Sequence, residues 1–337
     1  MRLITIEEHF GDPAVAAAGA AEMNRLSPGF RAAYGPGSGL PHSPSLEDLA
    51  DLDSGRLAAM DACGIDVQVL SCLSTQLLPA ADARELVPAV NDRLAAAIAR
   101  HPDRFAGFAA LPTAAPEAAG DELRRAVGEL GLVGTLIHGR TGERFLSEPQ
   151  FDPVLRAAAE LQVPIYLHPA PPPRGTTDTS YVGLDPIVAT RLQTAAWGWH
   201  VETGLHFLHL VLHGVFDRYP DLQVILGHWG EMIPWFLDRL DDTLPQRATS
   251  LERPISDYVR ANAYLTPSGM FSQAQLRYCA DVLGTDRIIY SVDYPFLPQD
   301  DAVAFLEHSD LPEPARHDIA HGNAEQLFKL SPSITNS

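Results

Sequence analysis

The chain has 337 residues, 46% of them hydrophobic, and carries 43 acidic against 24 basic side chains. The net charge of −19 argues against a nucleic-acid partner, because phosphate backbones are bound by clustered Lys and Arg. There is no apolar run of about 18 residues and no signal-peptide pattern, and the three cysteines are scattered, so we expect a soluble cytoplasmic protein with no membrane partner.

Short apolar runs recur along the chain, and most are followed by a polar turn and a helical pattern rich in Ala and Leu. We predict strands at residues 3–6, 67–70, 105–110, 132–137, 164–167, 223–226, 263–265 and 288–290. Helical patterns lie between them, for example at 49–64, 83–102, 115–131 and 151–162. Eight β/α repeats without a G-x-G-x-x-G motif or a linker predict a single domain, residues 1–337, with the (β/α)₈ TIM barrel fold.

Two segments interrupt this pattern after the first and fifth predicted strands. Residues 28–45 and 169–186 are rich in Pro, Gly and Ser. Long segments of this composition are either disordered surface loops or covers of active sites. Their position after strands favours active-site loops, and we expect Phe10, which follows the first strand, to line the entrance.

Most of the candidate catalytic or metal-binding residues directly follow predicted strands. Barrel enzymes place their active sites at the C-terminal ends of the strands. Strand 1 is followed by Glu7, Glu8 and His9, strand 5 by His168, and strand 8 by Asp293. Because side chains alternate along a strand, Glu7 and His9 project to one side and Glu8 to the other.

These strand-end residues match a ligand set for one divalent ion. Two imidazole nitrogens and two carboxylate oxygens suit Zn²⁺, Mn²⁺ or Fe²⁺ and leave room for water or substrate. The set consists of Glu7, His9, His168 and Asp293. Each residue alone has a common structural explanation, such as packing, helix capping or an ion pair. Four together are harder to explain in that way, because burying unpaired charges is costly.

Lysine usage narrows the chemistry further. Lys329 is the only lysine among the 24 basic residues. Schiff-base catalysis needs a lysine amine, and a two-metal site bridged by a carbamylated lysine needs one in the barrel. We therefore expect a single ion.

Several motifs resemble the amidohydrolase superfamily, and within it the aromatic acid decarboxylases that act on γ-resorcylate, 2,3-dihydroxybenzoate, 5-carboxyvanillate or aminocarboxymuconate semialdehyde. The motifs are IEEHF, DACGIDVQVLS, VPIYLHP, AAWGWHVETGLHFLHLVLHGVFDRYPDLQVILGHWGE, YLTPSG, RIIYSVDYPF and AHGNAEQLF. They cover nearly the whole chain, and the long central stretch and DYPF are the most specific. Family members are commonly dimers or tetramers, so the resemblance implies a homo-oligomer.

The resemblance also implies roles for individual residues. One divalent ion, Zn²⁺ or Mn²⁺, would be bound by four ligands, namely Glu7, His9, His168 and Asp293. His228 would lie beside the ion, supported by Glu231. Three residues match positions that line the substrate pocket in the family: Trp199, Arg239 and Phe296. The arginine would contact an acid or hydroxyl group of the substrate.

The sequence departs from the family pattern without losing a ligand. Pro267 and Val292 each replace a threonine, and His209 replaces an arginine that is common after the GLHFL stretch. The exit of strand 4 carries His138 and Arg140 where many decarboxylases have an asparagine-glycine turn. We therefore expect a substrate that differs from the simple hydroxybenzoates.

The predicted reaction is the non-oxidative decarboxylation of an aromatic acid with an ortho hydroxyl group, or of a related unsaturated acid. Asp293 is the candidate donor of the proton that replaces the carboxylate, and His228 with Glu231 would orient the substrate or relay the proton. The same residues would serve a hydrolase that acts on an ester, lactone or amide. A barrel that only binds metal is the third hypothesis.

Overall fold

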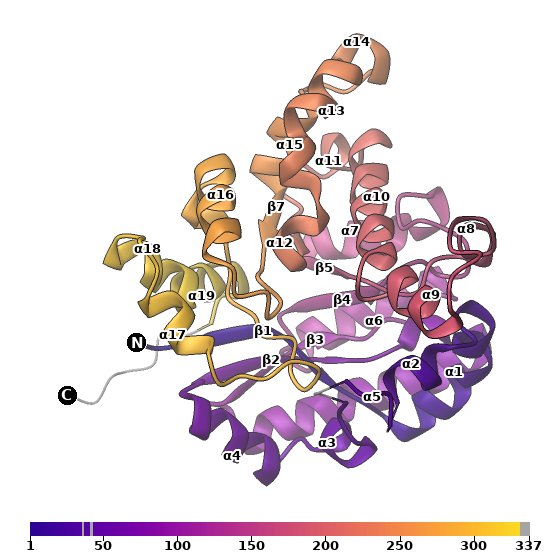
Figure 1. Ribbon diagram of the computed structural model, residues 1–337, viewed down its shortest axis with the longest axis vertical. Coiled ribbons are helices and arrows are strands. Elements are labelled where there is room, and N and C mark those ends of the chain that lie inside the picture. The colour runs from indigo at the N-terminus through magenta and orange to yellow at the C-terminus, as the bar shows by residue number, and fades with distance from the viewer. Residues whose placement is uncertain (36, 41–42, 331–337) are drawn as a thin grey trace.

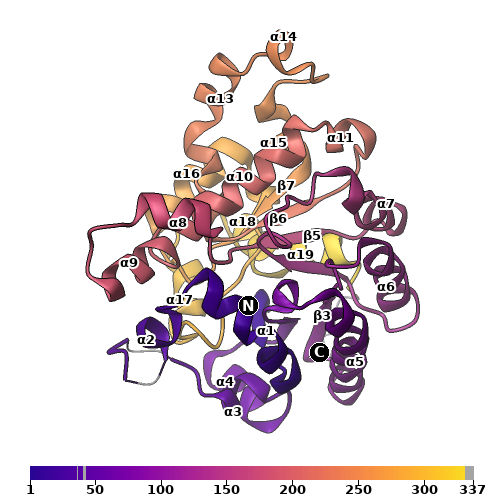
Figure 2. The same ribbon diagram turned by 90° about the vertical axis from the view of Figure 1, so that its right-hand side faces the viewer.

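The computed structural model describes residues 1–35, 37–40 and 43–330. Within these ranges, seven parallel strands form one sheet in sequence order. The strands are β1 (Ile4–Phe10), β2 (Val67–Cys72), β3 (Phe105–Ala109), β4 (Gly134–His138), β5 (Ile165–His168), β6 (Val224–Leu226) and β7 (Ala263–Leu265). The sheet lies at the centre of the molecule, with helices around it (Figures 1 and 2).

Helices follow most of the strands. Up to β5 they are α1 (Pro13–Leu26), α2 (Phe30–Tyr34), α3 (Leu46–Ala50), α4 (Ser54–Cys63), α5 (Ala80–Arg100), α6 (Pro116–Gly128) and α7 (Asp152–Leu161). After β5 they are α8 (Arg174–Ser180), α9 (Pro186–Gln193), α10 (Gly198–Leu212), α11 (Val215–Arg218), α12 (His228–Glu231), α13 (Leu237–Thr243), α14 (Gln246–Thr249), α15 (Ile255–Asn262), α16 (Gln273–Leu283), α17 (Ala302–Glu307), α18 (Glu313–His317) and α19 (Asn323–Phe328). The helical patterns predicted at 83–102, 115–131 and 151–162 are confirmed, and the pattern at 49–64 contains α4. Within the described ranges, no helix is both long and apolar enough to span a bilayer.

The eighth predicted strand, 288–290, is a single bridge instead of a regular strand. Ile288 pairs with Leu265 of β7, and the N–H of Ile289 donates to the Leu265 carbonyl at 2.9 Å. On the other side, the N–H of Ile6 in β1 donates to the Tyr290 carbonyl at 3.2 Å. The segment thus bonds to both β7 and β1, although it is too irregular to count as a strand.

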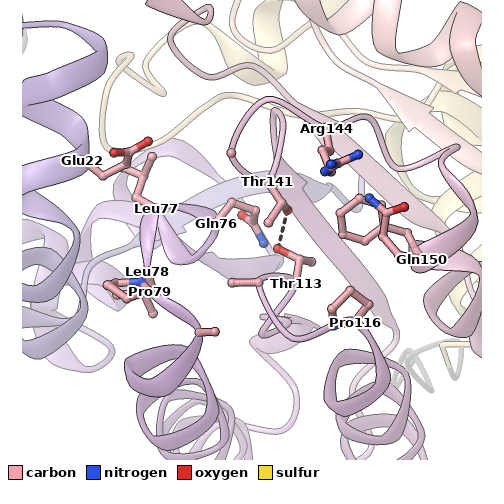
Figure 3. A pocket seen from close by; sticks show the side chains of 14 residues that line it. Glu22, Gln76, Leu77, Leu78, Pro79, Thr113, Pro116, Thr141, Arg144 and Gln150 are labelled. Atoms are coloured by element: carbon pink, nitrogen blue, oxygen red, sulfur yellow. Dashed lines mark hydrogen bonds between the residues drawn. The ribbon is translucent and has the colours of Figure 1, made fainter.

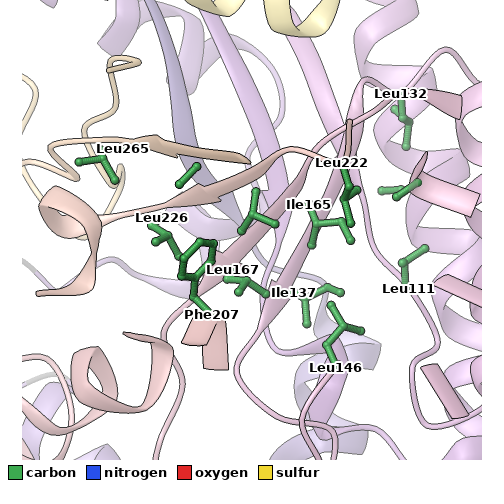
Figure 4. Close-up of a cluster of buried hydrophobic side chains, with 14 of the residues drawn as sticks. Leu111, Leu132, Ile137, Leu146, Ile165, Leu167, Phe207, Leu222, Leu226 and Leu265 are labelled. Atoms are coloured by element: carbon green, nitrogen blue, oxygen red, sulfur yellow. The ribbon is translucent and has the colours of Figure 1, made fainter. Parts of the chain in front are cut away.

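Two apolar cores lie on opposite sides of the sheet. The inner core contains side chains from the strands and α19, among them Ile4, Ile6, Val69, Phe108, Leu136, Tyr166, Ile225, Ile289 and Phe328. The outer core lies between the sheet and the helices, where Phe207 of α10 is close to Leu167 and Leu226 (Figure 4). Phe10 belongs to the outer core and is fully buried. The expectation that it lines the entrance is therefore wrong.

Strand β1 contains a bulge that decides which side chains face the interior. Its register with β2 shifts between Thr5 and Glu8. Because Ile6 packs in the inner core, strict alternation would point Glu7 outward. The extra residue of the bulge allows Glu7 and His9 to face the interior as well. β1 also continues through Phe10, four residues beyond its predicted end.

The two predicted loops contain short helices, and the segments that follow β1 and β5 contact each other. In the first loop, residues 36, 41 and 42 lie outside the described ranges. Helix α2 packs against α9, and the two are neighbours in both views (Figures 1 and 2). The hydroxyls of Tyr34 and Thr194 are 2.6 Å apart, and Arg191 donates to the Ser38 carbonyl at 2.7 Å. These bonds join the two segments.

Candidate metal centre and active site

The four predicted ligands lie together; they come from β1, β5 and the segment that follows residue 290. Glu7 Oε1 is 3.2 Å from His168 Nε2, and His9 Nε2 is 3.1 Å from Asp293 Oδ1. One possible ligand atom from each residue lies within 4.8 Å of all the others. Glu7 and His9 are fully buried. We call Glu7, His9, His168 and Asp293 the ion group.

The unpaired atoms of the ion group match the needs of a cation. His168 Nδ1 is 2.8 Å from the Pro169 carbonyl, which can only accept, so Nε2 of the neutral ring carries a lone pair. That lone pair faces Glu7 Oε1, another acceptor. In the described part of the chain, neither of these atoms nor His9 Nε2 has a hydrogen-bond partner. Acceptors that face each other without a proton fit a divalent ion between them.

The second oxygen of Glu7 is held by hydroxyl groups. Tyr166 donates to Oε2 at 2.5 Å, Ser268 also donates to it, and Thr266 donates at 3.3 Å. Burial opposes the charge of Glu7, but nearby imidazoles, His228 foremost, hold the pKa of this carboxyl below its ordinary value. The result is a charged carboxylate in a fixed orientation, as a metal ligand requires.

Glu8 points away from the ion group and holds the backbone on both sides of Asp293. Its two oxygens accept from the N–H groups of Val292 and Tyr294, each at 3.1 Å. Asp293 has a φ of 72°, which is uncommon for a residue other than glycine. Burial and the charge of Glu7 raise the pKa of Asp293 well above its usual range. Glu7 and Glu8 therefore have separate partners, as alternation along the strand predicts.

A row of hydrogen bonds leads away from the ion group through Glu231. His228 Nε2 is 4.0 Å from Glu7 Oε1, and its Nδ1 is 2.8 Å from Glu231 Oε1. Burial lowers the pKa of His228, but Glu231 and Glu7 outweigh it and raise that pKa to about 9. The other oxygen of Glu231 is 2.8 Å from His200 Nδ1, and Trp199 donates to His200 Nε2 at 3.1 Å. His200 is not among the site residues predicted from the sequence.

The segment that carries His228 and Glu231 has a left-handed backbone. All residues from His228 to Met232 have φ between 49° and 83°. The N–H of His228 donates to Ser268 Oγ at 2.9 Å, and the N–H of Trp229 donates to the Thr266 carbonyl at 2.8 Å. Left-handed geometry costs a residue other than glycine about 1–2 kcal/mol. Strain of this kind is typical of functional sites.

Comparison with known proteins identifies the family. The profile of the amidohydrolase family matches residues 42–330. The chain belongs to this family. This amidohydrolase is 36% identical to decarboxylase orsB of Emericella nidulans, with 97% of each chain covered. It is 37% identical to a γ-resorcylate decarboxylase of Polaromonas sp., with 84% of this chain and 89% of the relative covered.

Solved structures agree with this assignment. A dihydroxybenzoic acid decarboxylase from Polaromonas sp., with bound manganese and the inhibitor 2-nitroresorcinol, matches the amidohydrolase with a TM-score of 0.84. The two chains are 32% identical, and 98% of each is covered. The resemblance predicted from the motifs is thereby confirmed at the level of the family.

A substitution at Gly230 tests how tightly the left-handed segment of the amidohydrolase is packed. A Cβ atom on Gly230, at φ 83°, would lie 2.7 Å from Leu265 Cδ2 and 3.0 Å from atoms of Pro234. We expect Gly230→Ala to lower the free energy of unfolding by about 1–3 kcal/mol in urea denaturation. Gly128→Ala is the control, because nothing lies within 4 Å of that position and alanine favours helices. Equal stability of the two variants would contradict this account of the segment.

The three predicted pocket residues differ in their placement. The ring centroid of Phe296 is 5.8 Å from that of His9, so it borders the ion group. Trp199 reaches the group indirectly, through His200 and Glu231. Arg239 is exposed on α13, which projects from the body of the amidohydrolase (Figure 1). Its role in binding the substrate stays a prediction.

His138, which the sequence identifies only as a departure from the family pattern, also lies beside the ion group. It ends β4, opposite His168 in the parallel pairing with β5, and it is 7% exposed. Its ring centroid is 4.6 Å from that of His168 and 5.8 Å from that of His9. Burial, and then the neighbouring imidazole of His168, lowers the pKa of His138 well below its ordinary value. Its position at a strand end and its departure from the family pattern are the signals in the sequence that point to it.

A cavity of about 540 Å³ lies near His138. Its lining includes Gln76, Thr113 and Thr141 (Figure 3), and Gln76 Oε1 accepts from the N–H of His138 at 2.9 Å. The residues that line this cavity include neither the ion group nor the other predicted site residues. The cavity therefore adjoins the site through Gln76 and does not enclose the ion group.

Proposed function

We propose that this amidohydrolase is a carboxy-lyase that removes CO₂, without oxidation, from an aromatic acid with an ortho hydroxyl group or from a related unsaturated acid. The convergence of the ion group carries the proposal, because its unpaired acceptors are matched to a divalent ion. Relatives that align over most of the chain are named decarboxylases. The ion group would also serve a hydrolase, so it is the named relatives that favour decarboxylation over hydrolysis.

We propose one divalent ion, Mn²⁺ or Zn²⁺, with Glu7, His9, His168 and Asp293 as its ligands. The manganese in the related decarboxylase supports Mn²⁺. When bound, the ion supplies Lewis-acid chemistry that orients the carboxylate and the ortho oxygen of the substrate and stabilises the ionised phenol.

The protein would supply the proton that the reaction consumes. An aromatic carboxylate and one proton give the arene and CO₂, so the ring carbon that loses the carboxylate gains a hydrogen. Asp293 is the proposed donor, since it belongs to the ion group and therefore lies beside the place where the substrate carboxylate would bind. His228, held by Glu231 through Nδ1, would orient the substrate oxygens. Phe296 would form an apolar wall beside the ring.

We infer that the segment 288–290 closes the sheet into a (β/α)₈ barrel with active-site loops after β1 and β5. Its hydrogen bonds to β7 and β1 support this inference, as does the place of Ile289 in the inner core. Strand ends of such a barrel meet at one mouth, which accounts for the convergence of the ion group.

We propose that the protein is a dimer or tetramer. Val201 and Leu205 are exposed and lie four residues apart on α10, so they form an apolar stripe, and the exposed Trp197 directly precedes this helix. Val188 and Leu192 are exposed on α9. Light scattering should give a mass of at least twice 36.5 kDa, and a Val201→Asp, Leu205→Asp variant should shift toward the monomer. A monomeric wild type at micromolar concentration would refute the proposal.

The proposed reaction is tested with the Mn²⁺-loaded protein and two panels of compounds. One panel holds ortho-hydroxylated aromatic acids, and the other holds lactones and aryl esters. We expect CO₂ release from at least one acid and no acid release from the esters. Hydrolysis of an ester together with no CO₂ from any acid would overturn the proposal in favour of a hydrolase.

A further inference from the structure

His138 brings a third imidazole to the two histidines of the ion group. It ends β4 and lies opposite His168 in the parallel pairing of β4 with β5, so the two side chains project to the same side of the sheet. The ring centroid of His168 is 4.6 Å from that of His138 and 4.6 Å from that of His9. All three residues are buried. The strands β1, β4 and β5 thus bring three buried imidazoles together.

The ring of His138 has no partner within the described part of the chain. Neither of its nitrogens has a hydrogen-bond partner there, although the residue is only 7% exposed. Burying such a group without a partner is unfavourable for folding. A neutral imidazole carries a lone pair on one of its two nitrogens. His138 can therefore offer a lone pair to a ligand from outside the chain.

The three histidines form a ligand set of their own beside the ion group. One nitrogen from each of His9, His138 and His168 lies within 4.8 Å of the nitrogens of the other two. The set with Glu7 and Asp293 does not include His138. Two rings, those of His9 and His168, belong to both sets. The two sets therefore overlap and differ in their remaining members, which are one imidazole in the first and two carboxylates in the second.

The two shared rings can serve only one ion at a time. Nδ1 of His9 is 2.9 Å from Ser71 Oγ, and Nδ1 of His168 is 2.8 Å from the Pro169 carbonyl. Each ring thus has Nε2 left over, and in the described ranges neither Nε2 has a hydrogen-bond partner. One nitrogen has one lone pair. The two sets would therefore compete for a single ion instead of holding one each.

We propose that His9, His138 and His168 form a second, all-imidazole ligand set, through which His138 raises the preference of the protein for Zn²⁺ over Mn²⁺. Imidazole suits Zn²⁺, whereas carboxylate suits Mn²⁺. The three histidines would hold Zn²⁺, and the ion group with its two carboxylates would hold Mn²⁺. This inference rests on the ion site of the proposed function and is independent of the proposed reaction.

The ratio of the affinities for Zn²⁺ and Mn²⁺ tests the proposal without turnover. Zn²⁺ binds more tightly than Mn²⁺ at most sites, so the informative quantity is the change of this ratio, measured by competition with a chelator. In His138→Leu, the ratio should fall by at least about tenfold, because even a residue that only supports a ligand is worth about 10–100-fold in metal affinity. The affinity for Mn²⁺ should stay within about threefold of the wild type.

Glu7→Gln is expected to change the ratio in the opposite direction. It removes a carboxylate from the ion group and leaves the three histidines unchanged. The affinity for Mn²⁺ should therefore fall more than the affinity for Zn²⁺. A fall of the ratio in this variant would contradict the existence of two ligand sets.

X-ray absorption spectroscopy counts the imidazoles that are bound to the ion. The Zn²⁺-loaded wild type should show three, from His9, His138 and His168, and Zn²⁺-loaded His138→Leu should show two. The Mn²⁺-loaded wild type should also show two, because the ion group contains two histidines. This count does not depend on activity or on small changes in stability.

Control variants separate ligation from packing. His138→Asn keeps a polar group at the end of β4 and serves if the leucine variant does not fold; it should lose the third imidazole and part of the Zn²⁺ preference. His308→Leu removes an exposed histidine that follows α17 and should leave the ratio unchanged.

The outcomes distinguish this inference from the proposed function. Two imidazoles on Zn²⁺ in the wild type, or an unchanged ratio in His138→Leu, would overturn the inference and leave the ion group intact. A wild type that binds neither ion would overturn both the inference and the ion group. Absence of CO₂ release from a wild type that binds Mn²⁺ would refute only the proposed reaction.

Discussion

Replacement of Asp293 by asparagine is expected to abolish most decarboxylation while leaving the site assembled. Asparagine has nearly the same shape as aspartate. It can keep one oxygen in the place of Asp293 Oδ1, which is 3.1 Å from His9 Nε2. It has no carboxylic proton to deliver to the ring carbon. We expect kcat to fall by about 10²–10⁴-fold, which is the usual worth of a positioned general acid. CO₂ release measures kcat, and calorimetry with 2-nitroresorcinol measures whether the pocket still binds.

The matched control for this variant is Asp300→Asn. Asp300 is exposed and lies in the same segment of the chain, so its replacement removes one negative charge without touching the ion group. Its kcat should equal that of the wild type. Full activity in Asp293→Asn would show that the proton comes from another group. Loss of 2-nitroresorcinol binding would show instead that Asp293 serves mainly to assemble the site.

Glu7→Gln and Glu8→Gln are expected to have different effects, although the two residues are adjacent: the first should lower the affinity for Mn²⁺ and the second the stability of the fold. Glu7→Gln removes a negative charge from the ion group, so affinity for Mn²⁺ should fall more than about 100-fold, beyond the usual cost of losing a supporting residue. Glu8→Gln should retain Mn²⁺. Each oxygen of Glu8 accepts a hydrogen bond, one from the N–H of Val292 and one from the N–H of Tyr294. Because the variant has an amide nitrogen in place of one oxygen, one of these bonds is lost. Its free energy of unfolding should fall by about 1.5–3 kcal/mol.

Both variants are compared by calorimetric titration with Mn²⁺ and by urea denaturation of the metal-free protein. The metal-free comparison matters because a bound ion stabilises the folded state and would mix the two effects. Equal loss of Mn²⁺ affinity in both variants would mean that the assignment of the two faces of β1 is incorrect.

Much of the fold was predictable because apolar periodicity is a local property of the sequence. The strands near 67–70 and 105–110 and the helices at α5, α6 and α7 follow directly from that periodicity. The irregularity of 288–290 was not predictable, because the segment has the same apolar composition as a strand. Its two neighbours in the sheet are far apart in the sequence, so only the folded chain shows how few ladder bonds it makes.

The ion group was predictable from residue types at strand ends, but the way in which Glu7 reaches it was not. Alternation correctly places Glu7 and Glu8 on different sides of the strand. Ile6 faces inward as Glu7 does, although strict alternation would put these neighbours on opposite sides. The bulge in β1 explains how both can face inward. A bulge depends on pairing with β2 and leaves no mark in the sequence of β1 alone. His200 was missed for a similar reason, because a left-handed turn brings Glu231 to it.

The two neighbouring acids of β1, Glu7 and Glu8, serve different purposes: one serves the proposed chemistry and the other the folded structure. Glu7 belongs to the ion group, whereas Glu8 binds the backbone beside Asp293. In a descendant of this protein that no longer catalysed its reaction, selection would cease to act on the charge at position 7. The acid at position 8 would still be needed, since it accepts hydrogen bonds from the N–H groups of Val292 and Tyr294. Among related sequences, an acid at position 8 without one at position 7 would therefore indicate a protein that has lost its activity and kept its fold.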